Sequence, residues 1–149
     1  MKNTRREFLK KLSYLAILAA IPRAAWASWN HKAFAADELQ TAIKEKFGDL
    51  PVVDSDAVTL KAPNIAENGK VVPISVKSSL ENVSSITVFV AKNPYPLATS
   101  IKLGKGTIAD ISVRIRMAQT STVVALVEAE GKLYRTSQQV KVTIGGCGG

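Results

Sequence analysis

The residue with the clearest chemistry is Cys147, the only cysteine in a chain of 149 residues. It lies near the carboxyl end between two pairs of glycines, Gly145, Gly146, Gly148 and Gly149. Because glycine lacks a Cβ and loses the most conformational freedom on ordering, such a stretch adds nothing to a folded domain. Fully extended at roughly 3.5 Å per residue, five residues span on the order of 17 Å. The pattern predicts a thiol on a flexible arm that can enter another protein's cleft.

The sequence around Cys147 favours a carrier over a catalyst. A single cysteine cannot form a disulfide within the chain, so in an exported protein it either cross-links to a partner or serves as a reactive group. The terminal carboxylate two residues later disfavours the thiolate, and no cation lies near Cys147 in the sequence. We therefore expect the thiol to be activated by the site that receives it, and the chain not to be an enzyme.

Other catalytic chemistries lack their residues in this sequence. The single histidine, His31, excludes most histidine-based metal sites and catalytic triads. There is no metal-ligand cluster, glycine-rich phosphate loop or nucleophile elbow, so we expect neither metal nor cofactor. Gly104-Lys105-Gly106 is too short to hold a phosphate and predicts a turn. Three acids in expected loops would form an acid/base pair only by accident of folding: Asp54, Asp56 and Glu67.

Residues 1–27 have the pattern of a twin-arginine signal peptide. The segment Thr4-Arg5-Arg6-Glu7-Phe8-Leu9-Lys10 precedes an apolar stretch, Leu12 to Ile21, that is too short to span a bilayer as a stable helix. Ala25-Trp26-Ala27 offers a cleavage site after Ala27, and Ala33-Phe34-Ala35 offers a second one after Ala35. We expect a periplasmic protein that is exported folded, together with a partner subunit, and has no membrane anchor.

The basic balance of the chain comes mainly from this leader. Residues 1–27 hold six of the 20 Lys and Arg residues and one of the 12 acids, which leaves 14 basic and 11 acidic residues. No run of Lys or Arg interleaved with aromatic residues follows residue 27. The charge pattern therefore does not indicate a nucleic-acid-binding protein.

The remaining chain predicts a short helix followed by a β-domain. Apolar residues recur at three- and four-residue spacings from Trp29 to Phe47, and Gly48 is a natural stop, so residues 28–49 form an N-terminal helix. Residues 50–144 change to a period of two, with short strands between turn signals such as Asn68-Gly69. This pattern is typical of an all-β antiparallel sandwich, with residues 145–149 as the arm.

Two of the expected strands have distinctive faces. In the first, Ile111, Val113, Ile115 and Met117 face a core, while Arg114 and Arg116 face solvent or, less favoured, an anion or a partner. The second, residues 122–129, is apolar on both faces. Such a strand is covered on both sides, either within the fold, which we favour, or by a partner.

Several segments resemble the SoxY family, the cysteine-bearing subunits of the SoxYZ carrier in bacterial thiosulfate oxidation. The matching segments are the twin-arginine leader, the helix start Trp29 to Phe34, Pro63–Gly69 before a valine-rich strand, Lys92–Leu97, Arg116–Ser121 and Gly145–Gly149. The similarity covers nearly the whole chain, and the tail on an exported protein is its most specific part.

The resemblance implies an immunoglobulin-like sandwich paired with SoxZ as a heterodimer. It implies that Cys147 carries thiosulfate-derived sulfur covalently and that Gly145, Gly146, Gly148 and Gly149 form a swinging arm. A haem enzyme, SoxAX, would conjugate thiosulfate to the cysteine, and a hydrolase, SoxB, would release sulfate. Where it is present, a sulfane dehydrogenase, SoxCD, would oxidise the remaining sulfur.

Two other functions are compatible with parts of the sequence. A structural or adhesion sandwich would use Cys147 only to cross-link two chains. A thiocarboxylate carrier of the ubiquitin-like kind would use the terminal Gly148-Gly149, but such proteins act in the cytoplasm and need no export leader.

Overall fold

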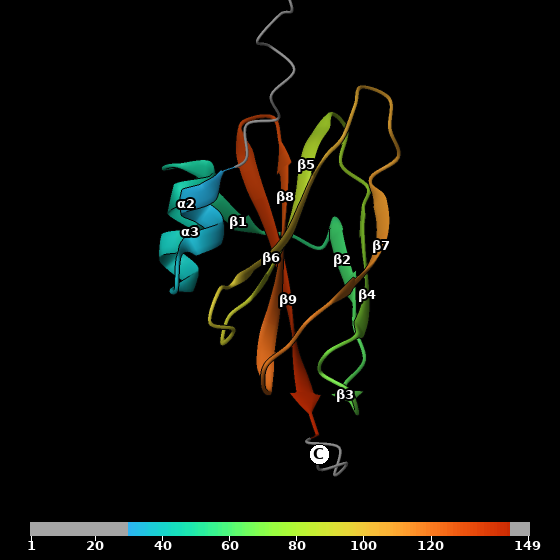
Figure 1. Ribbon diagram of the computed structural model, residues 1–149. Helices are drawn as coiled ribbons and strands as arrows, with labels where there is room; N and C mark the ends of the chain where they lie inside the picture. The colour runs from blue at the N-terminus through green and yellow to red at the C-terminus, as the bar shows by residue number, and fades with distance from the viewer. Residues whose placement is uncertain (1–29, 144–149) are drawn as a thin grey trace, which may run out of the picture.

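The computed structural model describes residues 30–143, which form two short helices and two packed β-sheets (Figure 1). The larger sheet has the strand order β1-β9-β8-β5-β6, with β3 beside β9, and the smaller sheet has the order β2-β4-β7. The strands are β1 Val52–Asp54, β2 Val58–Lys61, β3 Ile65–Ala66, β4 Val72–Ser78, β5 Val83–Val90, β6 Leu97–Lys102, β7 Asp110–Ile115, β8 Ser121–Ala129 and β9 Lys132–Val142. The expectation of an all-β sandwich behind a helical segment is confirmed.

Two strand pairs differ from the antiparallel arrangement expected from the sequence. Both β1 and β3 run parallel to β9, opposite Leu133–Arg135 and Lys141–Val142 respectively. The 11-residue β9 has β8 on one side, so the backbone groups of its other edge need partners as well. The strands before and after β2 in the chain, β1 and β3, supply these hydrogen-bond partners, and both run parallel to β9. Alternation in the sequence indicates where strands lie but not which way their neighbours run.

The pair of Asp54 and Arg135 fixes β1 against β9. Nε and Nη2 of Arg135 donate to Oδ1 and Oδ2 of Asp54 over 2.7 and 2.9 Å. These hydrogen bonds from the guanidinium hold the pKa of Asp54 below its usual value. Asp54 is therefore paired with Arg135 and not with Asp56 or Glu67, the other two acids considered for an acid/base pair.

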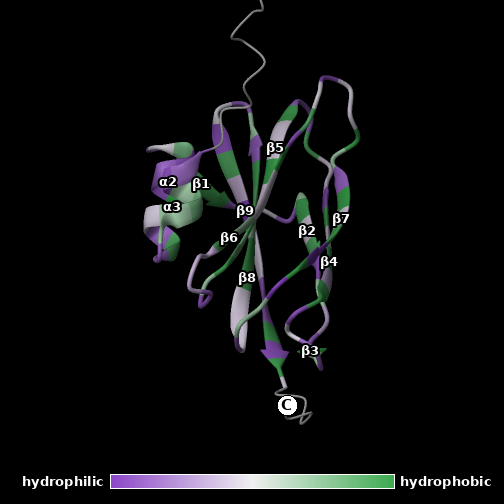
Figure 2. Ribbon diagram, viewed as in Figure 1, coloured by the Kyte–Doolittle hydropathy of each residue, from purple (hydrophilic) through white to green (hydrophobic). Residues whose placement is uncertain are grey.

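One core fills the space between the two sheets. On one face of β8, Val123, Ala125 and Val127 pack there with residues of β4 and β5. The expected inward set on β7 and just after it also points there: Ile115 and Met117 are buried, and Ile111 and Val113 are partly buried. Arg114 and Arg116 are exposed, as expected. Figure 2 shows polar residues interrupting the apolar ones along β9, in keeping with its half-covered position.

A second core lies between the larger sheet and the helices. Val124 and Leu126, on the other face of β8, pack there with Phe89 and with Ala33 and Ala42 of the helices. The strand that is apolar on both faces is therefore covered on both sides by the chain itself. The expectation that Thr122–Ala129 is internal is confirmed, and this strand offers no apolar face to a partner.

The single helix expected over residues 29–47 is two helices in the structure. They are α2 His31–Ala35 and α3 Leu39–Phe47, separated at Ala36, whose ψ of 137° is extended. Asn30 links them, since its Oδ1 accepts from the N–H of Ala33 and its Nδ2 donates to the carbonyl of Glu45. The break lets both helices place small residues on the sheet. Gly48, with φ 68°, ends α3 as expected.

No helix within residues 30–143 has the length and apolar character needed to cross a membrane.

Candidate functional site: the root of the C-terminal arm

Cys147 and the glycines Gly145, Gly146, Gly148 and Gly149 lie outside the described residues. The part of the chain that positions them is β9, which ends beside β3 at one end of the sandwich (Figure 1). We call Lys141–Thr143 the arm root and this end of the sandwich the arm-proximal end. Strand register defines it: Ser121 of β8 pairs with Val140 here, whereas Ala129 and Lys132 pair at the opposite end.

Hydrogen bonds hold each residue of the arm root. The N–H of Lys141 donates to the carbonyl of Asn64 over 2.9 Å, and the N–H of Thr143 donates to the carbonyl of Ala66 over 3.1 Å. Between them, the N–H of Val142 donates to Oγ1 of Thr120 over 3.0 Å, and this hydroxyl is 3.4 Å from the Val142 carbonyl. The backbone is thus fixed on both sides up to Thr143, so whatever follows starts from a defined point.

Gly69 brings a third segment against the arm root. Its carbonyl accepts a 2.7 Å hydrogen bond from the N–H of Met117. A Cβ at Gly69 would lie 2.4 Å from the Met117 carbonyl oxygen and 3.0 Å from Cγ1 of Val142. Only glycine lets the turn after β3, the loop after β7 and the end of β9 approach so closely.

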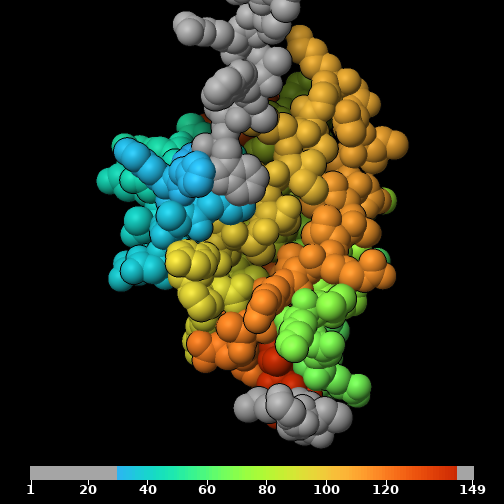
Figure 3. All heavy atoms as spheres, viewed as in Figure 1, coloured from blue at the N-terminus to red at the C-terminus, as the bar shows by residue number. Residues whose placement is uncertain are grey.

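The loop between β5 and β6 completes the arm-proximal end. The side chain of Asn93 donates to the carbonyl of Arg116 over 2.7 Å and accepts from the N–H of Ala118 over 2.9 Å. Gln119 donates through Nε2 to the carbonyl of Lys92 over 3.2 Å. These bonds attach the β5–β6 loop to the loop that contains Thr120. Figure 3 shows the segments around β3 (green), after β7 (orange) and at the end of β9 (red) adjoining on one face.

Three segments singled out in the sequence therefore meet in space: Pro63–Gly69, Lys92–Leu97 and Arg116–Ser121. Sequence reasoning picked each one separately and did not place them together. The signal that could have found them is composition, because each combines Asn, Gly or Pro turn residues with side chains able to bond to a neighbouring backbone.

Comparison with known proteins agrees with these segments. A sequence model described as "Sulfur oxidation protein SoxY" matches residues 43–147, which is more than half of the chain. The chain belongs to the SoxY family. The match runs through the arm root to Cys147, and membership gives the chain a role in sulfur oxidation.

A solved structure supports the same assignment. The sulfur carrier protein SoxY from Chlorobium limicola f thiosulfatophilum is 43% identical, with 72% of this chain and 97% of that chain covered and a TM-score of 0.66. A chain in a structure on the bacterial superantigen toxic shock syndrome toxin-1 is 13% identical, with 58% of this chain and 99% of that chain covered. Its TM-score is 0.40, so it bears on neither fold nor function. No curated protein matches the chain.

The other residues considered from the sequence are not brought together in this SoxY family member. His31 is exposed on α2, Asp54 is paired with Arg135, and no group of metal-ligating side chains forms within residues 30–143. Gly104-Lys105-Gly106 is a turn, as expected: Thr107 donates to the Gly104 carbonyl over 3.1 Å, and Gly106 has φ 77°.

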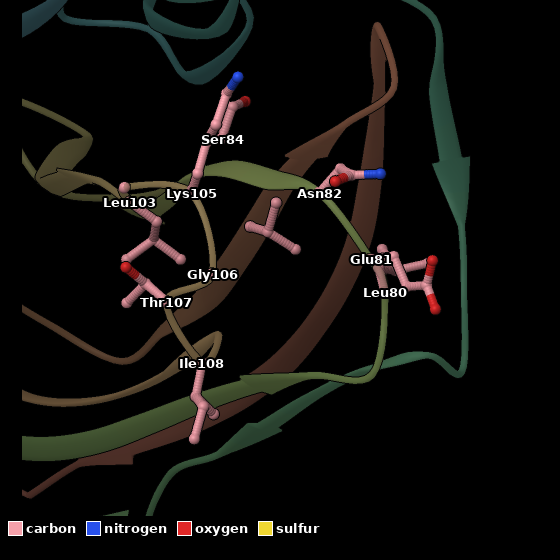
Figure 4. Close-up of a pocket in the computed structure, with 11 residues that line it drawn as sticks. Leu80, Glu81, Asn82, Ser84, Leu103, Lys105, Gly106, Thr107 and Ile108 are labelled. Carbon is pink, nitrogen blue, oxygen red and sulfur yellow. The ribbon is translucent and has the colours of Figure 1, made fainter.

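A hollow of about 670 Å³ lies at the end of the sandwich opposite the arm root (Figure 4). Leu80, Val83, Leu103 and Ile108 give it an apolar lining, and Lys105 and Glu81 add charges. Its residues come from the β4–β5 and β6–β7 connections and from the start of β5, and none of them carries a thiol. The hollow is therefore separate from the sulfur chemistry expected of the arm.

Proposed function

We propose that the chain is a covalent sulfur carrier in periplasmic thiosulfate oxidation and that Cys147 is the attachment point. The observation that carries the proposal is the family match, which extends through residue 147. The Chlorobium relative is itself named a sulfur carrier protein. The fixed arm root supports the same role, because a carrier needs a rigid body from which a mobile thiol can start.

The thiol is oxidised when it is loaded. The outer sulfur of thiosulfate joins the Cys147 sulfur to give Cys–S–S–SO₃⁻. One S–S bond forms, one proton is released and two electrons pass to the haem enzyme SoxAX. Water then attacks the terminal sulfonate on SoxB, the S–S bond to the sulfonate breaks, and sulfate leaves with two protons. Cys–S–S⁻ remains, ready for SoxCD where that enzyme is present.

Within this scheme the chain supplies reach and a defined origin, and the enzymes supply the activation. Val142 and Thr143 are held, while Gly145, Gly146, Gly148 and Gly149 have no Cβ that could clash in a narrow channel. SoxZ would be the stable partner, exported with this chain by the twin-arginine route. Because both faces of β8 are covered within the fold, we expect SoxZ to bind a surface other than the Thr122–Ala129 strand.

The alternative function is a structural sandwich that is cross-linked through Cys147. Intact mass spectrometry of periplasmic protein, without reductant, tests the proposal against it. A carrier gives monomers whose mass is raised by sulfur or by sulfur oxyanions, and reductant removes the added mass. A population that is chiefly disulfide dimer, with no sulfur adducts, would reject the carrier function.

We also expect the signal peptide to be cleaved after Ala27 and not after Ala35. Ala33 is fully buried, and α2 packs in the core between the helices and the larger sheet. Cleavage after Ala35 would remove α2 and expose the apolar surface that it covers. N-terminal sequencing of the exported protein should give Ser28 as the first residue. A mature chain that starts at Ala36 would show that α2 is dispensable.

A further inference from the structure

The two ends of the sandwich carry opposite charge balances. The loops and strand ends at the arm-proximal end, residues 62–72, 90–97, 115–121 and 140–143, hold four cations and a single acid, Glu67. The cations are Lys70, Lys92, Arg116 and Lys141, and all four are exposed. The corresponding segments at the opposite end, residues 78–84, 102–110 and 128–133, hold three cations, Lys102, Lys105 and Lys132, and four acids, Glu81, Asp110, Glu128 and Glu130.

Three of these cations lie in the arm root or next in the chain to residues that contact it. Gly69 lies against both Met117 and Val142. The N–H of Met117 donates to the carbonyl of Gly69, and a Cβ at Gly69 would contact Met117 and Val142. Lys70, Arg116 and Lys141 are the chain neighbours of these three residues. None of the three cations forms an ion pair within residues 30–143, where the pairs are Lys77 with Asp110 and Arg135 with Asp54. Their charges are not neutralised by a neighbouring carboxylate.

The length of the chain after Thr143 limits how far Cys147 can lie from these cations. Cys147 is the fourth residue after Thr143, so even a fully extended chain carries it only about 14 Å from the arm root. Interactions between exposed charges are screened over about 10 Å at 0.1 M salt and about 30 Å at 0.01 M. A cluster of like charges within this range raises the local concentration of an oppositely charged reactant and its rate of encounter.

We propose that Lys70, Arg116 and Lys141 form a cationic collar that draws sulfur oxyanions to the arm. The ligand class is a small anion with a sulfonate group, either free or already joined to Cys147. This inference rests on the proposed function only in taking Cys147 as the reactive thiol. The collar supplies the positive charge that the sequence around Cys147 lacks.

Tetrathionate tests the collar without any partner enzyme. The Cys147 thiolate attacks one of its two central sulfurs, a new S–S bond forms to give Cys–S–S–SO₃⁻, and the central S–S bond breaks. Thiosulfate leaves with the electron pair, so charge and atoms balance. A neutral pyridyl disulfide reacts with the same thiolate by the same exchange. The ratio of the two rates therefore cancels any change in thiolate content and reports attraction of the anion alone.

Two matched triple variants of the full mature chain separate a local field from net charge. One is Lys70→Gln, Arg116→Gln and Lys141→Gln; the other is Lys102→Gln, Lys105→Gln and Lys132→Gln at the opposite end. Each removes three positive charges from exposed side chains. At about 10 mM salt we expect the first to lower the tetrathionate-to-neutral rate ratio roughly 3- to 10-fold and the second less than about 2-fold. At about 0.5 M salt both should approach the wild-type ratio.

Two results would overturn the collar. An unchanged ratio in the first variant would show that the arm lies beyond the field of these cations. An equal fall in both variants would show that only net charge matters. Thermal unfolding of both variants verifies that the fold is intact. The assay is independent of cellular sulfur adducts, so a collar effect without such adducts would reject the carrier function while leaving the collar in place.

Discussion

Cys147→Ser is expected to reduce sulfur transfer to background in a reconstituted thiosulfate-oxidising system. A serine hydroxyl forms no S–S bond and is a weak nucleophile without a neighbouring base, so neither loading nor exchange can occur. The free energy of unfolding should stay unchanged, because none of the buried residues that hold the two sheets together is altered. The measurements are sulfate release and intact mass before and after addition of thiosulfate.

Chemical blocking provides the control for this substitution. Wild-type protein alkylated at its single cysteine should behave as the serine variant does, which separates loss of the thiol from any effect of serine itself. Sulfur transfer that persists in Cys147→Ser would contradict a carrier function of the thiol. It would direct attention to the terminal Gly148-Gly149 as a thiocarboxylate.

Gly69→Ala is expected to destabilise the domain and to loosen the arm root. The new Cβ would lie 2.4 Å from the backbone oxygen of Met117, which cannot rotate away as a side chain can. The turn must shift, which strains the Met117 to Gly69 hydrogen bond and displaces Val142. Overpacking of this kind costs roughly 1–3 kcal/mol. For a domain of this size that corresponds to a fall in Tm on the order of 5–15 °C.

Hydrogen exchange shows where the loss occurs. In Gly69→Ala the amides of Lys141, Val142 and Thr143 should exchange faster, since their acceptors lie in the segments that must move. Gly104→Ala is the matched control: its Cβ would lie 3.5 Å from Oγ1 of Thr107, an ordinary contact, at the end away from the arm. Equal stability of the two variants, or unchanged exchange at the arm root, would contradict the role given to Gly69.

The strand pattern of this domain could be anticipated because side-chain period is a local property. The alternation of Ile111, Val113, Ile115 and Met117 places them on one face whatever the partner strand, and they do pack in the core. The apolar run in Thr122–Ala129 predicted that both faces of the strand are buried. The smaller sheet covers one face and the helices cover the other. What supplies the cover could not be known, since it depends on segments distant in the sequence.

Two features of the fold differ from the interpretation of the sequence: the break in the helical segment and the parallel pairing of two strands. Both depend on tertiary contacts. The helix expected over residues 29–47 breaks at Ala36, where packing on the sheet outweighs the continuity of the apolar stripe. The parallel pairing of β1 and β3 with β9 follows from the need to satisfy an edge that no local pattern reveals.

The sequence by itself determined the thiol, its glycine neighbours and the family resemblance, because these are properties of residues adjacent along the chain. It also gave the thiol no cation to favour its reaction with an anion. Only the tertiary structure brings Gly69, Met117 and Val142 into contact, and with them Lys70, Arg116 and Lys141 around the arm root. The physical reason is that charges act through space and not along the chain. Cations up to about 70 residues apart in the sequence come near one another once the turn after β3 and the loop after β7 pack against the end of β9.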